Sequence, residues 1–145
     1  MTEAPSIEDG LVPLAEILAT VDLERSLTDR GQHADPRAAA NDPLLGARVA
    51  VVRDPDGATI AVAEPTTEGR LAASLARHGE GPAGRYVGVP EEDGLEAFRR
   101  RAAAAGVGIS GVAIGPFGPS VLVLDGPVSG PHLIVVERRS LPSGR

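Results

Sequence analysis

The chain has 145 residues, a formal net charge of −6, and 42% hydrophobic and 23% charged residues, a balance typical of one globular domain. The absence of cysteine and lysine excludes disulfides, thiolate catalysis, cysteine-bound metals and Schiff-base chemistry. The acidic charge argues against nucleic-acid binding, no apolar run approaches the ~20 residues of a membrane span, and the acidic first residues lack the features of a signal peptide, so we expect a cytoplasmic protein.

The first part of the chain predicts a strand and a short helix. Residues 1–10 are expected to be a flexible tail, and alternating apolar positions over 11–21 predict a strand. Asp22 is expected to cap a helix that runs to Arg30. Residues 32–43 are rich in Asp, Pro and Ala and predict a loop.

A hairpin and a second helix follow. Residues 47–53 and 59–64 predict two strands, because Asp54-Pro55-Asp56-Gly57 between them is a strong turn signal. Thr67 is expected to cap a helix that ends at His78, before the breaker Gly79-Glu80-Gly81-Pro82.

The same order of elements then recurs. The predicted elements are a strand over 84–89, a helix over 91–105, a weak glycine-rich strand over 107–114, and a hairpin of 120–124 with 132–137. Nearly the same number of residues separates Glu64 from Glu137 as separates Ala15 from Gly84. This near-constant spacing indicates a duplicated strand–helix–hairpin module. We therefore predict one α+β domain over 11–139, with modules at 11–78 and 82–139 and a tail over 140–145.

Several segments carry a family resemblance. They are 48–52 and 61–65, 71–77, His78-Gly-Glu-Gly81, and Gly130-Pro-His-Leu-Ile-Val-Val-Glu137. The order of a hairpin ending in Glu-Pro, a short helix and then Gly-Glu-Gly resembles the middle of methylmalonyl-CoA epimerases, in the vicinal oxygen chelate (glyoxalase-like) superfamily. The resemblance implies a glyoxalase-like α+β fold, with two βαβββ modules that form a curved mixed sheet around a cleft.

The resemblance also implies where a metal would bind. In that superfamily each module supplies two metal ligands, and the four positions fall on Ala15, Ala61, Gly84 and Ile134. None of these side chains has a donor atom. We therefore expect the fold without its metal and without any other cofactor.

The residues that would line the cleft follow from strand alternation through those four positions. They are Pro13, Ala15, Ile17, Ala19, Thr59, Ala61, Ala63, Gly84, Tyr86, Gly88, His132, Ile134 and Val136. Only Thr59, Tyr86 and His132 bring polar chemistry to this apolar face. Such a face is the usual form of a small-molecule site.

Two of these side chains are candidate catalytic groups. His132 can act as a general acid or base near neutral pH, or it can be a structural histidine at a strand start. Tyr86 can donate a hydrogen bond to an enol or oxyanion, or it can be a core aromatic. Arg85 and Arg48 can bind a carboxylate or phosphate, although strand arginines commonly face solvent. Thr59, Ala15, Ala61, Gly84 and Ile134 complete the expected substrate-binding set.

Two functions remain open at this stage. The first is a metal-independent isomerase, epimerase, cyclase or lyase that moves a proton on a small carbonyl compound. The second is a non-catalytic binding protein, similar to the drug-sequestering resistance proteins of the same superfamily. The scarcity of aromatic residues (Tyr86, Phe98 and Phe117) weighs against the second, and the lack of a strong catalytic constellation weighs against the first. In either case we expect a small-molecule ligand and a homodimer.

Overall fold

The computed structural model describes residues 7–8, 10–32, 35–90, 92–126 and 130–137. The elements of the first half are β1 (Val12–Ala19), α1 (Leu23–Asp29), the 3-10 helix η1 (Pro36–Ala38), β2 (Ala40–Asp42), β3 (Ala47–Arg53) and β4 (Thr59–Pro65). Helix α2 (Arg70–His78) leads to the second half, which consists of β5 (Gly81–Gly88), α3 (Gly94–Ala104), β6 (Ala113–Gly115), β7 (Gly118–Leu122) and β8 (His132–Val136). Apart from η1, each half has the order βαβββ, which confirms the predicted fold class.

All eight strands form one sheet in the order β2-β3-β4-β1-β5-β8-β7-β6. The central strands β1 and β5 are antiparallel, and each has a parallel neighbour, β4 or β8. Ile17 pairs with Ala61 in the first half, and Tyr86 pairs with Ile134 in the second. Ala15 and Gly84, two residues earlier on their strands, therefore occupy equivalent places, as the repeat predicted.

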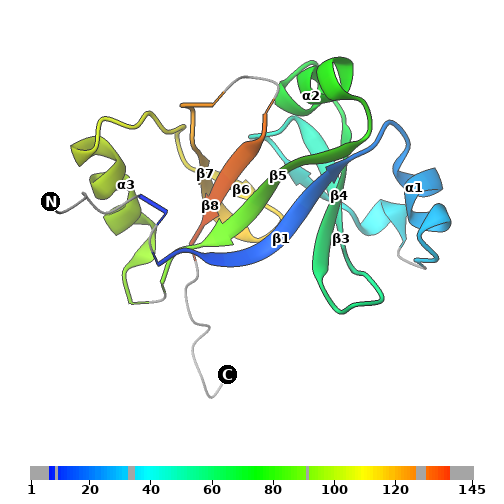
Figure 1. Cartoon of the computed structure of the whole chain (residues 1–145), viewed down its shortest axis with the longest axis horizontal. Coiled ribbons are helices and arrows are strands. Elements are labelled where there is room, and N and C mark those ends of the chain that lie inside the picture. Colours follow the sequence, from blue (N-terminus) through cyan, green and yellow to red (C-terminus); the bar gives the residue numbers. More distant parts are fainter. Residues whose placement is uncertain (1–6, 9, 33–34, 91, 127–129, 138–145) are drawn as a thin grey trace, which may run out of the picture.

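The sheet curves until it is nearly a closed barrel. Strands β2 and β6, at its two ends, come back into contact with each other. Figure 1 shows β1 and β5 at the front of this barrel, with α1 and α3 at its opposite ends and α2 above it. Helix α2 also contributes to the interior, because its Leu71 belongs to the buried cluster inside the barrel.

Helices α1 and α3 cover parts of the outer face of the sheet. Leu23 and Leu27 of α1 pack on the outer side of β3 and β4. The outer side of the second half is covered by Leu95, Phe98 and Ala102 of α3, at the helical spacing that the sequence predicted. A central strip of the outer face, over β1 and β5, lies between the two helices (Figure 1).

Some predicted boundaries were wrong. Residues 32–43 are not wholly a loop, because Ala40–Asp42 pairs with β3 as strand β2. Helix α2 begins after Gly69 rather than after Thr67, whose hydroxyl lies close to Gly46. Over 107–114, only the bridge of Ile109 with Val123 and the start of β6 have strand pairing.

Other predictions fall partly beyond the described residues. The predicted tails include residues 1–6, 9 and 138–145, which lie outside them. Asp22 does cap α1, because its side chain accepts a hydrogen bond from the backbone N–H of Arg25. Within the described ranges, each helix is too short or too polar to cross a bilayer.

Candidate functional site

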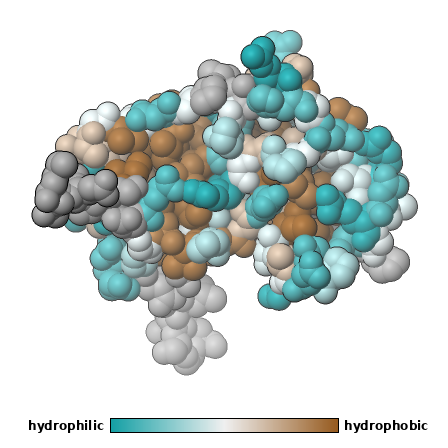
Figure 2. Space-filling model, viewed as in Figure 1, coloured by the Kyte–Doolittle hydropathy of each residue, from teal (hydrophilic) through white to brown (hydrophobic). Residues whose placement is uncertain are grey.

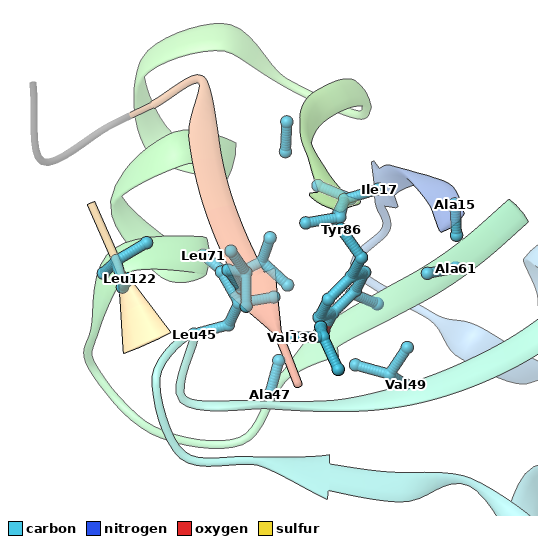
Figure 3. Close-up of a cluster of buried hydrophobic side chains, with 14 residues drawn as sticks. Ala15, Ile17, Leu45, Ala47, Val49, Ala61, Leu71, Tyr86, Leu122 and Val136 are labelled. Atoms are coloured by element: carbon cyan, nitrogen blue, oxygen red, sulfur yellow. The ribbon is translucent and has the colours of Figure 1, made fainter. Parts of the chain in front are cut away.

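The concave face of the sheet is packed with side chains. Ala15, Ala61 and Ile134, at three of the predicted metal positions, are at most 6% exposed and belong to one hydrophobic cluster. Figure 3 shows Ala15 and Ala61 beside Ile17, Val49 and Tyr86 in this cluster. Alternation therefore put these three side chains on the same face, but they form a core where the sequence suggested an open cleft. No group of three or more His, Asp or Glu side chains in the described part of the chain could hold a metal ion.

Tyr86 lies inside this core and has one polar partner. Its hydroxyl donates a hydrogen bond to the carboxylate of Asp42, on β2. Its ring packs against Phe117 with the two centroids 5.0 Å apart. Burial raises the pKa of Tyr86 well above its usual range, and the negative charge of Asp42 raises it further. Tyr86 therefore remains a neutral hydrogen-bond donor.

Asp42 lies where the two ends of the curved sheet meet. It is fully buried, and its carboxylate also accepts the backbone N–H of Leu44 at 2.9 Å. A Cβ atom on Gly115 of β6 would lie 3.5 Å from the same carboxylate. The sequence analysis did not identify Asp42, because Asp42-Pro43 has the same residue types as Asp35-Pro36 earlier in that segment, where Asp35 is exposed.

The raised pKa of Tyr86 predicts a loss of stability at alkaline pH. The pKa of an unfolded tyrosine is about 10. Because the pKa of Tyr86 is higher in the folded state, its contribution to the free energy of unfolding is complete below pH ~10. This contribution falls as the pH rises above that value. The chain has no lysine or cysteine, so few other groups titrate there, and Tyr86 is its only tyrosine. Ultraviolet absorbance should show tyrosinate appearing together with unfolding. Ionisation near pH 10 in the folded protein would contradict this placement.

His132 lies at the start of β8 and is only 3% exposed. Its Nδ1 is 3.1 Å from the carbonyl oxygen of Ala83, on the neighbouring strand β5. Because a carbonyl oxygen can only accept, Nδ1 must carry the proton of this hydrogen bond. In the neutral ring, Nε2 therefore has the lone pair that a general base requires.

His132 also lines a surface hollow of about 490 Å³, which we call the outer hollow. The full lining is Glu8, Glu16, Pro82, Gly84, Arg85, Val123, Pro131, His132 and Leu133. Three predicted site residues, Gly84, Arg85 and His132, thus meet here. Glu16 and Arg85 alternate with buried Ile17 and Tyr86 along their strands, so the hollow opens on the outer face of the sheet.

Three of the titratable residues of the outer hollow, Glu16, Arg85 and His132, come from three adjacent strands. Arg85 of β5 pairs in register with Glu16 of β1 and also forms an ion pair with Glu8. His132 of β8 lies on the other side of β5. Glu16 and His132 therefore belong to the two strands on either side of β5, although His132 pairs with Gly84 and the β8 partner of Arg85 is Leu133. Glu16 was not among the site residues that the sequence predicted.

The other predicted site residues lie elsewhere. Arg48 forms an ion pair with Glu64, with Nε and Oε1 2.6 Å apart. Thr59 is partly buried at the start of β4, opposite Arg53. Tyr86 is in the core and is not part of the lining of the outer hollow. A catalytic role for Tyr86 stays a prediction.

The strand order, the paired modules and the curved sheet define the vicinal oxygen chelate, or glyoxalase-like, fold. Methylmalonyl-CoA epimerases are among the solved structures that share it. The enzyme from Mycobacterium tuberculosis has a TM-score of 0.70 and 20% identity, over 97% of this chain and 94% of that one. A single-substitution variant of the Streptomyces coelicolor enzyme has a TM-score of 0.62 and 19% identity, over 87% of this chain and 98% of that one.

A hypothetical protein, BH1468 from Bacillus halodurans C-125, has the same fold. Its TM-score is 0.67 at 16% identity, over 94% of this chain and 100% of that chain. No family model matches the sequence. No curated protein matches it either. At these identities the structural likeness shows the fold alone.

Proposed function

We propose that this protein is a metal-independent enzyme of epimerase type, which moves a proton on a carbon atom beside a carbonyl group. One observation carries the proposal: Glu16 and His132, from the two strands on either side of β5, line a single hollow together with Arg85 of β5. An epimerase must remove a proton from one side of a carbon and return a proton on the other. Two acid–base groups on either side of a cation suit that task.

The proposed reaction uses these three side chains. Either Nε2 of His132 or the carboxylate of Glu16 takes the proton, depending on which epimer is bound. The electron pair of the C–H bond moves into the carbonyl, and the guanidinium of Arg85 stabilises the resulting enolate oxygen. The group on the opposite side, which must already carry a proton when the first group is deprotonated, then donates that proton to the carbon and inverts its configuration, so that the two groups exchange protonation states in each turnover.

The fold also supports a choice of first substrate. Epimerase neighbours were solved with 2-nitronate-propionyl-CoA and with methylmalonyl-CoA and NH4+. We infer that an acyl thioester with an acidic α-hydrogen is the first compound to try. The outer hollow, at about 490 Å³, is within the usual size range of small-molecule sites.

The direct test is hydrogen exchange. Methylmalonyl-CoA incubated with the protein in D2O should lose its α-hydrogen signal in proton NMR faster than without protein. The variants Glu16→Gln and His132→Asn should each slow epimerisation by at least ~10²-fold while the fold is retained. Arg48→Gln, whose ion pair lies elsewhere, is the matched control and should exchange normally. No exchange with any tested thioester or small keto acid would reject the proposal.

A binding function is the second candidate. The near-complete burial of His132 and the ion pair of Arg85 with Glu8 would also suit a protein that only holds a ligand. Under this alternative, the His132 variant would weaken ligand affinity by ~1–2 kcal/mol, the scale of one lost hydrogen bond, and no substrate would turn over. The size of that effect separates the two functions.

The proposed metal independence predicts the metal content of the protein. Ala15, Ala61, Gly84 and Ile134 have no donor atoms at the positions where the resemblance would put ligands. Elemental analysis of untagged protein should therefore find far less than one equivalent of zinc, nickel, cobalt, manganese or iron. Stoichiometric metal whose removal by a chelator abolishes exchange would contradict this prediction.

We also propose a homodimer. Support comes from Val112 and Ile114, large apolar side chains that are 49% and 67% exposed at the last strand of the sheet. A second copy that covered this edge would remove them from water. Light scattering at micromolar concentration should give about twice the chain mass of 14.8 kDa. Ile114→Asp should shift the mass toward that of the monomer, and a monomeric unmodified protein would reject the proposal.

A further inference from the structure

A second surface hollow lies along helix α3 and has a basic side. Its volume is about 320 Å³, and we call it the helix hollow. Its full lining is Glu96, Arg99, Arg100, Ala103, Val107 and Ile109. The proposed proton transfer uses none of these residues.

A row of paired residues connects the two hollows across the sheet. Arg85 of β5 pairs with Leu133 of β8. The backbone N–H of Val123 donates to the carbonyl of Leu133 at 3.0 Å, and Val123 in turn pairs with Ile109. Arg85, Leu133 and Val123 line the outer hollow, whereas Ile109 lines the helix hollow. Three inter-strand steps of ~4.8 Å put Ile109 about 14 Å from Arg85.

The middle of this row is apolar and only partly covered. Val107, Ile109, Val123 and Leu133 pack against the cluster under α3, and each is partly buried. Figure 2 shows a hydrophobic area between α3, on the left, and the polar side chains at the centre of the same face. A shallow apolar strip thus runs between two charged ends.

The far end of the strip is basic, although the chain as a whole is acidic. Arg99, Arg100 and Arg101 are consecutive on α3, in a chain with a net charge of −6. Arg99 is 3.0 Å from Glu96, and Arg100 is exposed. Arg101 is turned to the other flank of the helix, where it contacts Asp93 at 3.6 Å. Two of the three arginines therefore lie beside the helix hollow.

We propose that the outer hollow, the apolar strip and the helix hollow together bind one linear acyl compound that has an anionic group at its far end. The identity of the head group at Arg85 rests on the proposed function. The apolar middle of the ligand would lie on Leu133, Val123 and Ile109. Its anionic end would pair with Arg99 and Arg100, because guanidinium groups bind carboxylates and phosphates well.

A small ligand suits this strip better than a second protein chain. A stable protein interface removes roughly 800 Å² of surface from each partner. The four apolar side chains of the strip are already partly buried, so they offer little additional area. The ion pairs at the two ends, Arg85 with Glu8 and Arg99 with Glu96, are exposed and can exchange for ligand anions.

The test uses linear probes of different length. Dodecanedioate, with a carboxylate at each end, should bind more tightly than dodecanoate, which has one, and more tightly than glutarate, which is short. The double substitution Arg99→Gln/Arg100→Gln should weaken dodecanedioate binding at least tenfold, to the level of dodecanoate. Arg101→Gln, on the other flank of α3, is the matched control and should bind as the unmodified protein does. Calorimetry measures each affinity.

Several outcomes would overturn the proposal. Equal affinity for dodecanedioate and dodecanoate would show that the far anchor is absent. An equal loss in Arg101→Gln would show only a general charge effect. No binding, together with a change of oligomeric state in the double variant, would identify the strip as an interface between copies. Because none of these probes tests hydrogen exchange, dodecanedioate binding without exchange would reject the proposed function and keep this site.

Discussion

Replacing Tyr86 with phenylalanine should lower the free energy of unfolding by about 3 kcal/mol. Tyr86 and Asp42 are both essentially inaccessible to water, at 1% and 0% exposure, and they bond to each other. The substitution leaves the shape of the core intact but removes one of the hydrogen bonds that compensate a buried carboxylate. A hydrogen bond to a charged group contributes ~1.5–3 kcal/mol, and an unsatisfied buried group adds to the cost. Chemical denaturation measures this loss directly.

A matched variant tests the mechanism of this loss. Asp42→Asn retains an oxygen that can accept the Tyr86 hydroxyl, so it should cost less than Tyr86→Phe. In the double variant, the phenylalanine no longer lies beside an unsatisfied carboxylate. The loss of unfolding free energy should therefore be smaller than the sum of the losses in the two single variants, by ~1 kcal/mol or more. Arg48→Gln, in a partly exposed ion pair, should cost less than ~1 kcal/mol. Additive costs at positions 42 and 86 would refute the coupling.

The repeated modules could be predicted from the sequence because their strands have strong local patterns. The predicted alternation along β1 and β5, and the turn after Arg53, agree with the observed pairing of Ile17 with Ala61 and of Tyr86 with Ile134. The same alternation correctly put these four side chains on one face. Core positions are readable in this way because burial alternates with every residue of a strand.

The sequence could not predict that this face forms a packed interior and not an open cleft. The segment Ala40–Asp42 has no apolar pattern and becomes a strand only by pairing with β3. Its arrival next to β6 brings Asp42 to Tyr86 and helps to close the barrel, so the expected cleft is a packed interior. This closure depends on the curvature of the whole sheet, which no local window encodes.

Alternation along the strands also did not predict where the candidate site lies. Along β5, both Ala83 and Tyr86 belong to the interior cluster, because the register shifts near Gly84. A simple alternation cannot put residues three apart on the same face. Arg85 and His132 both line the outer hollow, although alternation assigned them to opposite faces. Glu16 is on the outer face by ordinary alternation with Ala15 and Ile17.

Substitution of His132 should have the largest effect on activity. If His132 transfers the proton, His132→Ala should slow epimerisation by about 10²–10⁴-fold, the usual contribution of a general acid or base. His132→Asn is the more informative variant, because an asparagine amide can still donate to the carbonyl of Ala83. It should therefore fold like the unmodified protein while losing the same activity. NMR of the purified epimers in D2O provides the rates.

The two-sided arrangement makes this prediction more specific. Without His132, Glu16 can still remove the proton from the epimer that faces it, so that epimer should continue to exchange its hydrogen without inversion. The Glu16→Gln variant should show the opposite preference. If neither His132 variant changes any rate while Arg85→Gln abolishes exchange, the chemistry belongs to the outer-face charges alone. In that case His132, held by Ala83, is a structural residue at the start of β8.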